Sequence, residues 1–395
     1  MPDARESWIT GIGLVSCLGE GPDAHLDALN DGTPRVDATS FAPYLVHRVV
    51  KLDLDKQIPK KGDQRQMEPW QRIGTYAAGL ALDSAGVKGN ADLLGRMDMI
   101  VAAGGGERDG QVDLDVLAGV AKADKPEAYV NERLMNDLRP TLFLAQLANL
   151  LAGNISIVHG VTGSSRTFMG EESSGVDAVR VAQARIAAGQ SDLALVGGAY
   201  NAERWEVVLH FALGRTLIRG EHRSVWERSG MALGTIGAFL VLEEKGHAQA
   251  RGAKPLARIG VVAADHVRRI PGAVTGALER MWSTVKPRLD PAHAAVISGA
   301  SGVQPATSEE REFLRSQGLA VRATGTHFGH GLEPQFPANI ALAAAALGSG
   351  RLFAPADAFE RAMDGALRQV LLRQVVVTSI GHWRGEGLVL VEAAS

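Results

Sequence analysis

The sequence is poor in cysteine, in net charge and in long apolar runs. Cys17 is the only cysteine among 395 residues, which excludes an internal disulfide and favours a reducing compartment. A formal net charge of −3 argues against a nucleic-acid-binding surface. The longest apolar run, residues 338–347, is too short and alanine-rich to span a bilayer, and the polar start lacks the apolar core of a secretory signal. We therefore expect a cytoplasmic protein.

The composition and the order of patterns predict a duplicated α/β protein. Apolar residues make up 46% of the chain and charged residues 22%, which fits a soluble α/β fold with ample capacity for a core. Strand-like and helix-like segments alternate up to about residue 250, and a similar order of segments then begins again. We expect an N-terminal half over residues 1–250 and a C-terminal half over residues 251–395.

The chain is organised around residues 163–199. A short strand at 166–169 ends in a tight turn at Gly170, an amphipathic helix follows, and a second strand covers 193–197. Glu172 occupies the start of the helix. Free backbone N–H groups and the helix dipole make such a position suitable for a nucleophile or a bound anion. Here it carries a carboxylate.

Two neighbouring segments and two glycine groups complete the prediction. Residues 141–152 are apolar at helical spacing and predict a buried helix that stops at Gly153, and residues 155–158 predict a short strand. The glycines at 11, 13 and 19 do not have the spacing of a dinucleotide-binding turn. No P-loop lysine follows those at 104–106, where close backbone packing is sufficient explanation.

Four motifs in order carry a family resemblance over almost the whole chain. They are WITGIGLVSCLGEG near the start, GGA at 197–199, HRSVWERSGMALGTIGAFLVLEE at 222–244 and GTHFGHG at 325–331. The chain resembles the β-ketoacyl-ACP synthases of the thiolase superfamily, and this resemblance implies a thiolase-like layered αβαβα fold and a dimer. Residues 62–83 and 163–175 carry a narrower resemblance to the second, ketosynthase-like protein of clusters that make the very-long-chain hydroxyacyl group of lipid A.

The resemblance also implies which side chains the condensing reaction needs. The family uses a cysteine at the helix start as acyl carrier, two histidines that assist decarboxylation and stabilise the enolate, and a lysine. Counting back from GGA places Glu172 at the cysteine position. Gly299 falls at the first histidine, His330 at the second and Gly325 at the lysine. Acylating a carboxylate would give a hydrolysable anhydride, so Glu172 cannot replace the thiol.

The C-terminal gating turn departs from the family pattern as well. It reads Gly381, His382, Trp383 and Arg384, and the two larger side chains are expected to crowd the substrate entrance. The resemblance thus implies a catalytically degenerate subunit, similar to a chain-length factor, without cofactor or metal. Its expected partners are a catalytic ketosynthase in a heterodimer, or a second copy in a homodimer, and acyl carrier protein. The segments 166–169 and 141–152 are expected at or near the dimer interface.

Two other functions stay open at this point. The chain could be an active ketosynthase or a malonyl-ACP decarboxylase that uses Glu172 and His330, because decarboxylation needs no acyl-enzyme. It could instead be an acyl-ACP binding protein that retains only the old acyl tunnel. Glu172 itself either fills the emptied pocket and satisfies the helix start, or mimics a bound malonyl or acyl group and holds the partner's site in shape.

Three smaller features favour simpler explanations. Cys17 has no neighbouring base in sequence and is best explained as a small buried residue. His327, His330 and Glu333 have metal-like spacing but lie in a glycine-rich turn without further ligands. A scattered set of arginines could meet an acidic carrier protein, although isolated surface arginines are the commoner explanation; these are Arg204, Arg215, Arg219, Arg223 and Arg228.

Overall fold

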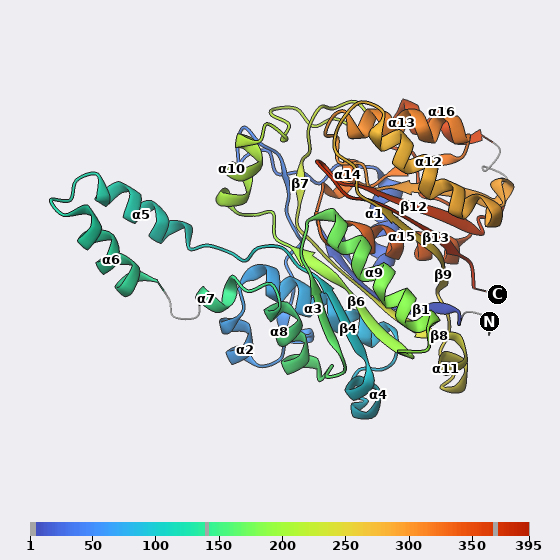
Figure 1. Ribbon diagram of the computed structural model, residues 1–395, viewed down its shortest axis with the longest axis horizontal. Helices are drawn as coiled ribbons and strands as arrows, with labels where there is room; N and C mark the ends of the chain where they lie inside the picture. The colour runs from blue at the N-terminus through green and yellow to red at the C-terminus, as the bar shows by residue number, and fades with distance from the viewer. Residues whose placement is uncertain (1–4, 139–141, 366–369, 395) are drawn as a thin grey trace.

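The computed structural model describes residues 5–138, 142–365 and 370–394 and has a mixed α/β architecture (Figure 1). Within these residues an 11-stranded sheet has the order β11-β10-β12-β13-β9-β1-β8-β6-β4-β5, with β2 paired to β1, and β3 and β7 form a small separate pair. The strands are β1 Ser7–Ser16, β2 Gly19–Glu20, β3 Val46–His47, β4 Asp98–Ala102, β5 Ser165–Phe168, β6 Leu193–Tyr200, β7 Leu233–Gly234, β8 Ile236–Glu244, β9 Ala257–Asp265, β10 Ala294–Ser298, β11 Ala320–Ala323, β12 Gln374–Ile380 and β13 Glu386–Glu392.

The sheet contains the same five-strand arrangement twice. One half has the order β5-β4-β6-β8-β1, the other β11-β10-β12-β13-β9, and corresponding neighbours pair in the same parallel or antiparallel sense. The halves meet where β1 and β9 pair antiparallel, with Ser7 opposite Ile259. The duplicated fold is therefore confirmed, while the boundary at residue 250 stays a prediction.

Helices cover the sheet in layers. The helices are α1 Pro22–Asp31, α2 Lys61–Gln66, α3 Pro69–Ser84, α4 Ala91–Arg96, α5 Gly110–Val120, α6 Pro126–Asp137, α7 Leu142–Ala145, α8 Leu150–His159, α9 Glu172–Ala187, α10 Trp205–Leu213, α11 Lys245–Ala250, α12 Ala273–Val285, α13 Ala306–Gln317, α14 Gly325–Phe328, α15 Gln335–Ser349 and α16 Ala358–Met363. One apolar cluster joins α9 and α15 to strands of both halves; a second joins α3 and α8 to the first half, and a third joins α12 and α13 to the second. α9 and α15 thus form a layer between the strands of the two halves, while α3 and α8 cover the first half and α12 and α13 the second. This is the expected αβαβα order.

Two glycines of β1 allow α3 to lie directly on the strand. A Cβ on Gly11 would come within 2.3 Å of the Ala81 carbonyl oxygen, and one on Gly13 within 1.9 Å of the Ala77 oxygen. Only glycine fits at such distances. These residues thus serve helix–strand packing.

The segment before β5 differs from the prediction. The expected helix over 141–152 is wrong: α7 ends at Ala145 and α8 begins at Leu150, while residue 141 lies outside the described residues. The expected strand over 155–158 is also wrong, because these residues form the second half of α8. Leu151, Ile155 and His159 are buried on one face of α8 and pack toward α3. This tertiary contact overrides the β-branched composition and the Gly153 turn signal.

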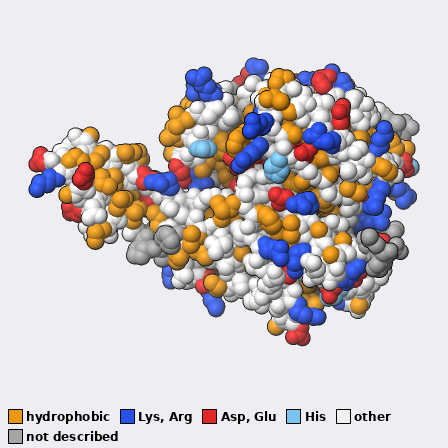
Figure 2. All heavy atoms as spheres, viewed as in Figure 1, with side chains coloured by type: hydrophobic (Ala, Val, Ile, Leu, Met, Phe, Trp, Pro, Cys, Tyr) orange, Lys and Arg blue, Asp and Glu red, His pale blue; other side chains and the backbone are white. Residues whose placement is uncertain are grey.

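A helical hairpin projects from the body of the molecule. Figure 1 shows α5 and α6 extending away from the sheet, and Figure 2 shows apolar side chains along them. No residue of either helix is buried. We call residues 110–137 the arm. Across the described residues, no helix has the length and apolar character needed to cross a membrane.

Candidate functional site

The candidate site lies where the chain turns from β5 into α9. Gly170 has φ 138°, and Glu171 adopts φ 57° and ψ −135°, a backbone conformation that side chains rarely accept. Glu172 is the first residue of α9 and is 1% exposed. The sharp turn directs the Glu172 side chain into the interior instead of along the surface.

Glu172 is held by two histidines from distant segments. His330 Nε2 lies 2.7 Å from Glu172 Oε1. The backbone N–H of His382 donates to the same oxygen at 2.9 Å, and His382 Nδ1 lies 3.1 Å from Oε1 and 3.3 Å from Oε2. The helix start, the 325–331 turn and the gating turn therefore converge on one carboxylate.

The charges in this network stabilise one another. Burial alone would raise the pKa of Glu172, but the hydrogen bonds from His330 and His382 outweigh it and hold that pKa far below its usual range. Burial would lower the pKa of His382, yet its hydrogen bond to Glu172 and the charges of both glutamates raise it. Glu172 is thus a carboxylate paired with a histidine whose protonated form is favoured.

Residues 381–384, which the resemblance implies to be the gating turn, lie against the same helix start. Trp383 Nε1 donates to Glu171 Oε2 at 2.6 Å, and the Arg384 guanidinium lies 4.3 Å from the Trp383 ring centre. The His382 ring meets Phe211 of α10 edge-on at 5.5 Å. The crowding of a substrate entrance by Trp383 and Arg384 stays a prediction. The contact of His382 with Glu172 was not predicted from the sequence, since residues 210 positions apart share no local pattern.

Neither glycine of the implied catalytic set has space for a larger side chain. A Cβ at Gly299 would lie 2.8 Å from the Thr378 carbonyl oxygen, and one at Gly325 would lie 2.7 Å from the Ala300 oxygen. Restoring a histidine or lysine at these positions requires backbone movement.

Glu333 is a further buried carboxyl group, and the charges of the site act on it. It is 3% exposed, its Oε1 packs against Gly104, and its Oε2 has no partner among the described residues. Burial, together with the charges of Glu172 and Glu171, raises the pKa of Glu333 to about 8. The sequence suggested Glu333 only as a possible metal ligand, because of its spacing from His330.

The structure separates the possible metal ligands named from sequence. His330 contacts Glu172, whereas the His327 ring lies 6.5 Å from Phe353 in an edge-on contact. Within the described residues, the group of three side chains close enough to share a metal is Glu171, Glu172 and His382. The hydrogen bonds given above already occupy the Glu172 oxygens.

Cys17 lies apart from this network. Its Sγ is 3.8 Å from His47 Nδ1, and burial raises the pKa of the thiol to about 12. A thiol that stays protonated is a poor nucleophile. The buried structural role expected from the sequence agrees with this environment.

Two of the five arginines that the sequence suggested as surface residues point inward. Arg228 is 5% exposed and lies in the interior. Arg204 is half-buried and donates to Asn201 O and Gly106 O. Local spacing along the chain could not distinguish these inward-facing arginines from exposed ones.

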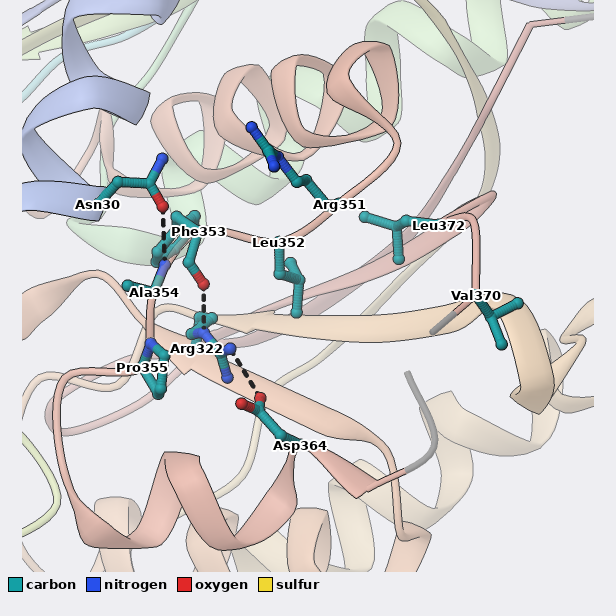
Figure 3. Close-up of a pocket in the computed structure, with 10 residues that line it drawn as sticks. All are labelled: Asn30, Arg322, Arg351, Leu352, Phe353, Ala354, Pro355, Asp364, Val370 and Leu372. Carbon is teal, nitrogen blue, oxygen red and sulfur yellow. Dashed lines mark hydrogen bonds and ion pairs between the residues drawn. The ribbon is translucent and has the colours of Figure 1, made fainter. Parts of the chain in front are cut away.

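A separate cavity of about 700 Å³ lies between α1 and the chain after α15, and Figure 3 shows its lining. Arg322 forms a buried ion pair with Asp364 at 2.7 Å on its wall and also donates to Phe353 O. None of the residues around Glu172 lines this cavity. The cavity and the Glu172 network are therefore separate features of the molecule.

Comparisons with known sequences support the resemblance to β-ketoacyl-ACP synthases, each over a different share of the chain. The family model for the beta-ketoacyl synthase N-terminal domain matches residues 5–248. The chain is 26% identical over 268 residues to 3-oxoacyl-[acyl-carrier-protein] synthase 2 of Vibrio cholerae, covering 65% of this chain and 62% of that protein. It is 26% identical over 372 residues to the oxytetracycline polyketide putative beta-ketoacyl synthase 1 of Streptomyces rimosus, covering 84% and 82%. The match thus spans less than two thirds of the Vibrio relative's length.

Solved structures extend the similarity of fold to the whole chain. The ishigamide ketosynthase/chain length factor superposes with a TM-score of 0.76 at 18% identity, covering 99% of this chain and 100% of that one. A complex described as AntDE:AntF, a type II polyketide acyl-carrier protein with its ketosynthase, gives a TM-score of 0.72 at 14% identity, with 99% and 100% covered. Because the family model covers more than half of the sequence, the chain belongs to the beta-ketoacyl synthase family.

Proposed function

We propose that this chain is a catalytically degenerate ketosynthase subunit that pairs with an active ketosynthase, as a chain-length factor does. The observation that carries the proposal is Glu172, buried at the nucleophile position and held by His330 and His382. A carboxylate cannot store an acyl chain as a thioester. Its lowered pKa also makes it a weak base.

The closed entrance supports the same proposal. Trp383 is bonded to Glu171 and His382 to Glu172, so the gating turn is tied to the head of α9 at two points. An acyl group would have to displace both contacts to reach the interior. The acyl chain would therefore be carried by the partner, with this subunit shaping the space at the interface.

The proposed partner surface lies at the open edge of the sheet. β5 ends the strand order, and its Ser165 and Arg166 are exposed. Ile157 of α8 is 71% exposed beside it, and the arm carries further exposed apolar residues. An unpaired edge strand next to apolar surface is suited to association with another chain.

The proposed reaction context follows from the narrower sequence resemblance. We place the heterodimer in cytoplasmic elongation of acyl-ACP toward a very long chain for lipid A. The similarity of residues 62–83 and 163–175 to the second ketosynthase-like protein of such clusters supports this substrate. Acyl carrier protein would deliver the substrate to the heterodimer.

Co-expression with an active ketosynthase from the same genome tests the proposal. We expect the two chains to co-purify in a 1:1 complex and the complex to make longer acyl-ACP than the ketosynthase alone, as measured by mass spectrometry. Glu172→Cys alone should not restore condensation in this chain, because Gly299 and Gly325 remain. A chain that forms only a homodimer and binds none of the co-expressed ketosynthases would contradict the proposal. Elongation of acyl-ACP by the Glu172→Cys chain alone would also contradict it.

The 2.7 Å contact between Glu172 and His330 keeps a decarboxylase as the second candidate. Incubation of the purified chain with malonyl-ACP distinguishes the two functions. We expect acetyl-ACP to stay at the background rate. Accumulation that Glu172→Ala abolishes, and that Asp177→Asn on the exposed face of α9 leaves intact, would favour the decarboxylase instead.

A further inference from the structure

Arg228 is a buried cation that has no carboxylate partner among the described residues. Its Nη2 donates to the carbonyl oxygens of Ser301 and Gly325, each at 3.1 Å. Its Nε and Nη1 make no hydrogen bond to any described residue. Water cannot easily satisfy them from outside, because Arg228 is only 5% exposed. Two carbonyl oxygens satisfy part of the guanidinium's hydrogen bonding but carry no full negative charge.

The described neighbours of Arg228 do not supply a negative charge. The neighbouring His47 is fully buried, and burial together with the charge of Arg228 lowers its pKa to about 3, so its ring is neutral. His222, which lies 5.8 Å from His47 between ring centres, has a pKa lowered by its own burial and by Arg228. Burial lowers the pKa of Arg228 only to about 10, which leaves the guanidinium charged at neutral pH.

Arg322 provides a direct comparison within the same chain. It is similarly buried, at 4% exposure, but its Nη2 lies 2.7 Å from Asp364 Oδ1 (Figure 3). Buried charges in proteins are normally paired in this way, because desolvating an isolated ion costs several kcal/mol. The described residues provide a negative charge for Arg322 but none for Arg228.

We propose that Arg228 binds a small monovalent anion, of which chloride is the simplest, behind the Gly325 turn. Gly302 packs against Arg228 Nε, since a Cβ on Gly302 would come within 2.7 Å of that atom, so an ion beside the guanidinium must be small. The unpartnered Nη1 and Nε supply the donors, Nη1 first because Gly302 restricts access to Nε. Because Nη2 joins the segments that carry Gly299 and His330, the anion would stabilise the turns behind the Glu172 network. This inference does not depend on the proposed pairing with a ketosynthase.

Crystals of the full chain grown in sodium bromide give the direct test. We expect an anomalous bromide peak within hydrogen-bonding distance of Arg228 Nη1 or Nε, and none at Arg322, whose charge Asp364 already balances. An ordered water at Arg228 with no anomalous signal would overturn the proposal. A bromide found equally at Arg322 would do so too, since it would mark adventitious binding only.

Thermal unfolding gives a second test in solution. At constant ionic strength, replacing gluconate by chloride should raise the Tm of the wild-type chain by about 2 °C or more. Arg228→Met should lose this dependence, whereas Arg223→Met, at an exposed arginine of the same segment, should keep it. An equal chloride response in both variants would refute the site, and if Arg228→Met does not fold, the bromide experiment decides.

Discussion

At the residue scale, Glu172 shows how tertiary contacts set the state of a carboxyl group. Burial favours its neutral form, but His330 and His382 place hydrogen-bond donors around its oxygens and reverse that preference. The same contacts raise the pKa of His382. Removing one partner of such a buried pair leaves the other partner uncompensated.

This pair should make stability depend on pH in two windows. The Glu172 contribution is present above its ordinary pKa of 4.5 and is lost as pH falls through the lowered folded value. The His382 contribution is complete below its ordinary pKa of 6.5 and is lost as pH rises through the raised folded value. Glu172→Gln should therefore destabilise the chain by about 3 kcal/mol at pH 6 and by less at pH 9.

Urea unfolding at both pH values measures this difference. Asp177→Asn is the matched control, because Asp177 lies on the same helix in an exposed pair with Arg180. A Glu172→Gln penalty that is the same at pH 6 and pH 9 would contradict the ion pair.

At the scale of elements, the arm is the part of the chain least supported by its own packing. α5 and α6 have 11 and 12 residues and bury none of them. Helices of this length are only marginally stable alone in water. Leu117 is 67% exposed and Met135 74%, so the arm presents apolar surface without cover from the described residues. The proposed ketosynthase partner would supply that cover.

A charge on the arm should therefore affect assembly and not folding. Leu117→Arg is expected to weaken binding to the co-expressed ketosynthase at least tenfold, while the Tm of the isolated chain changes by less than about 1 °C. Leu256→Arg, at an exposed leucine before β9, is the control and should leave binding unchanged. Analytical ultracentrifugation and thermal unfolding give the two readouts. Undiminished binding by Leu117→Arg would remove the arm from the proposed interface.

At the scale of the whole molecule, the two halves share one interior. α9 from the first half and α15 from the second pack together between strands of both, within a single apolar cluster. The antiparallel pairing of β1 with β9 adds a continuous hydrogen-bonded connection. Neither half can lose its central helix without exposing apolar surface on the other.

This arrangement predicts a single cooperative unfolding transition. The calorimetric and van't Hoff enthalpies should agree for the isolated chain. Ile340→Ala in α15, at a fully buried position, should cost about 2–5 kcal/mol and shift the whole transition, and Ile340→Val should cost less. Two resolved transitions, with only one moved by the substitution, would show that the halves unfold separately.

The sequence by itself determined the strand–turn–helix–strand unit around Glu172 and the duplicated order of most strands and helices, because both depend on local patterns. Periodicity identifies α9 and its flanking strands, and the repeated order of strands and helices predicts the duplicated fold. The same local rules failed at α8, where packing against α3 holds Ile155 in a helix. Tertiary structure alone decided that His330 and His382 meet Glu172, and that Arg228 lies inside with no carboxylate from the described part of the chain. These contacts join residues far apart in the chain, and burial then sets their charges.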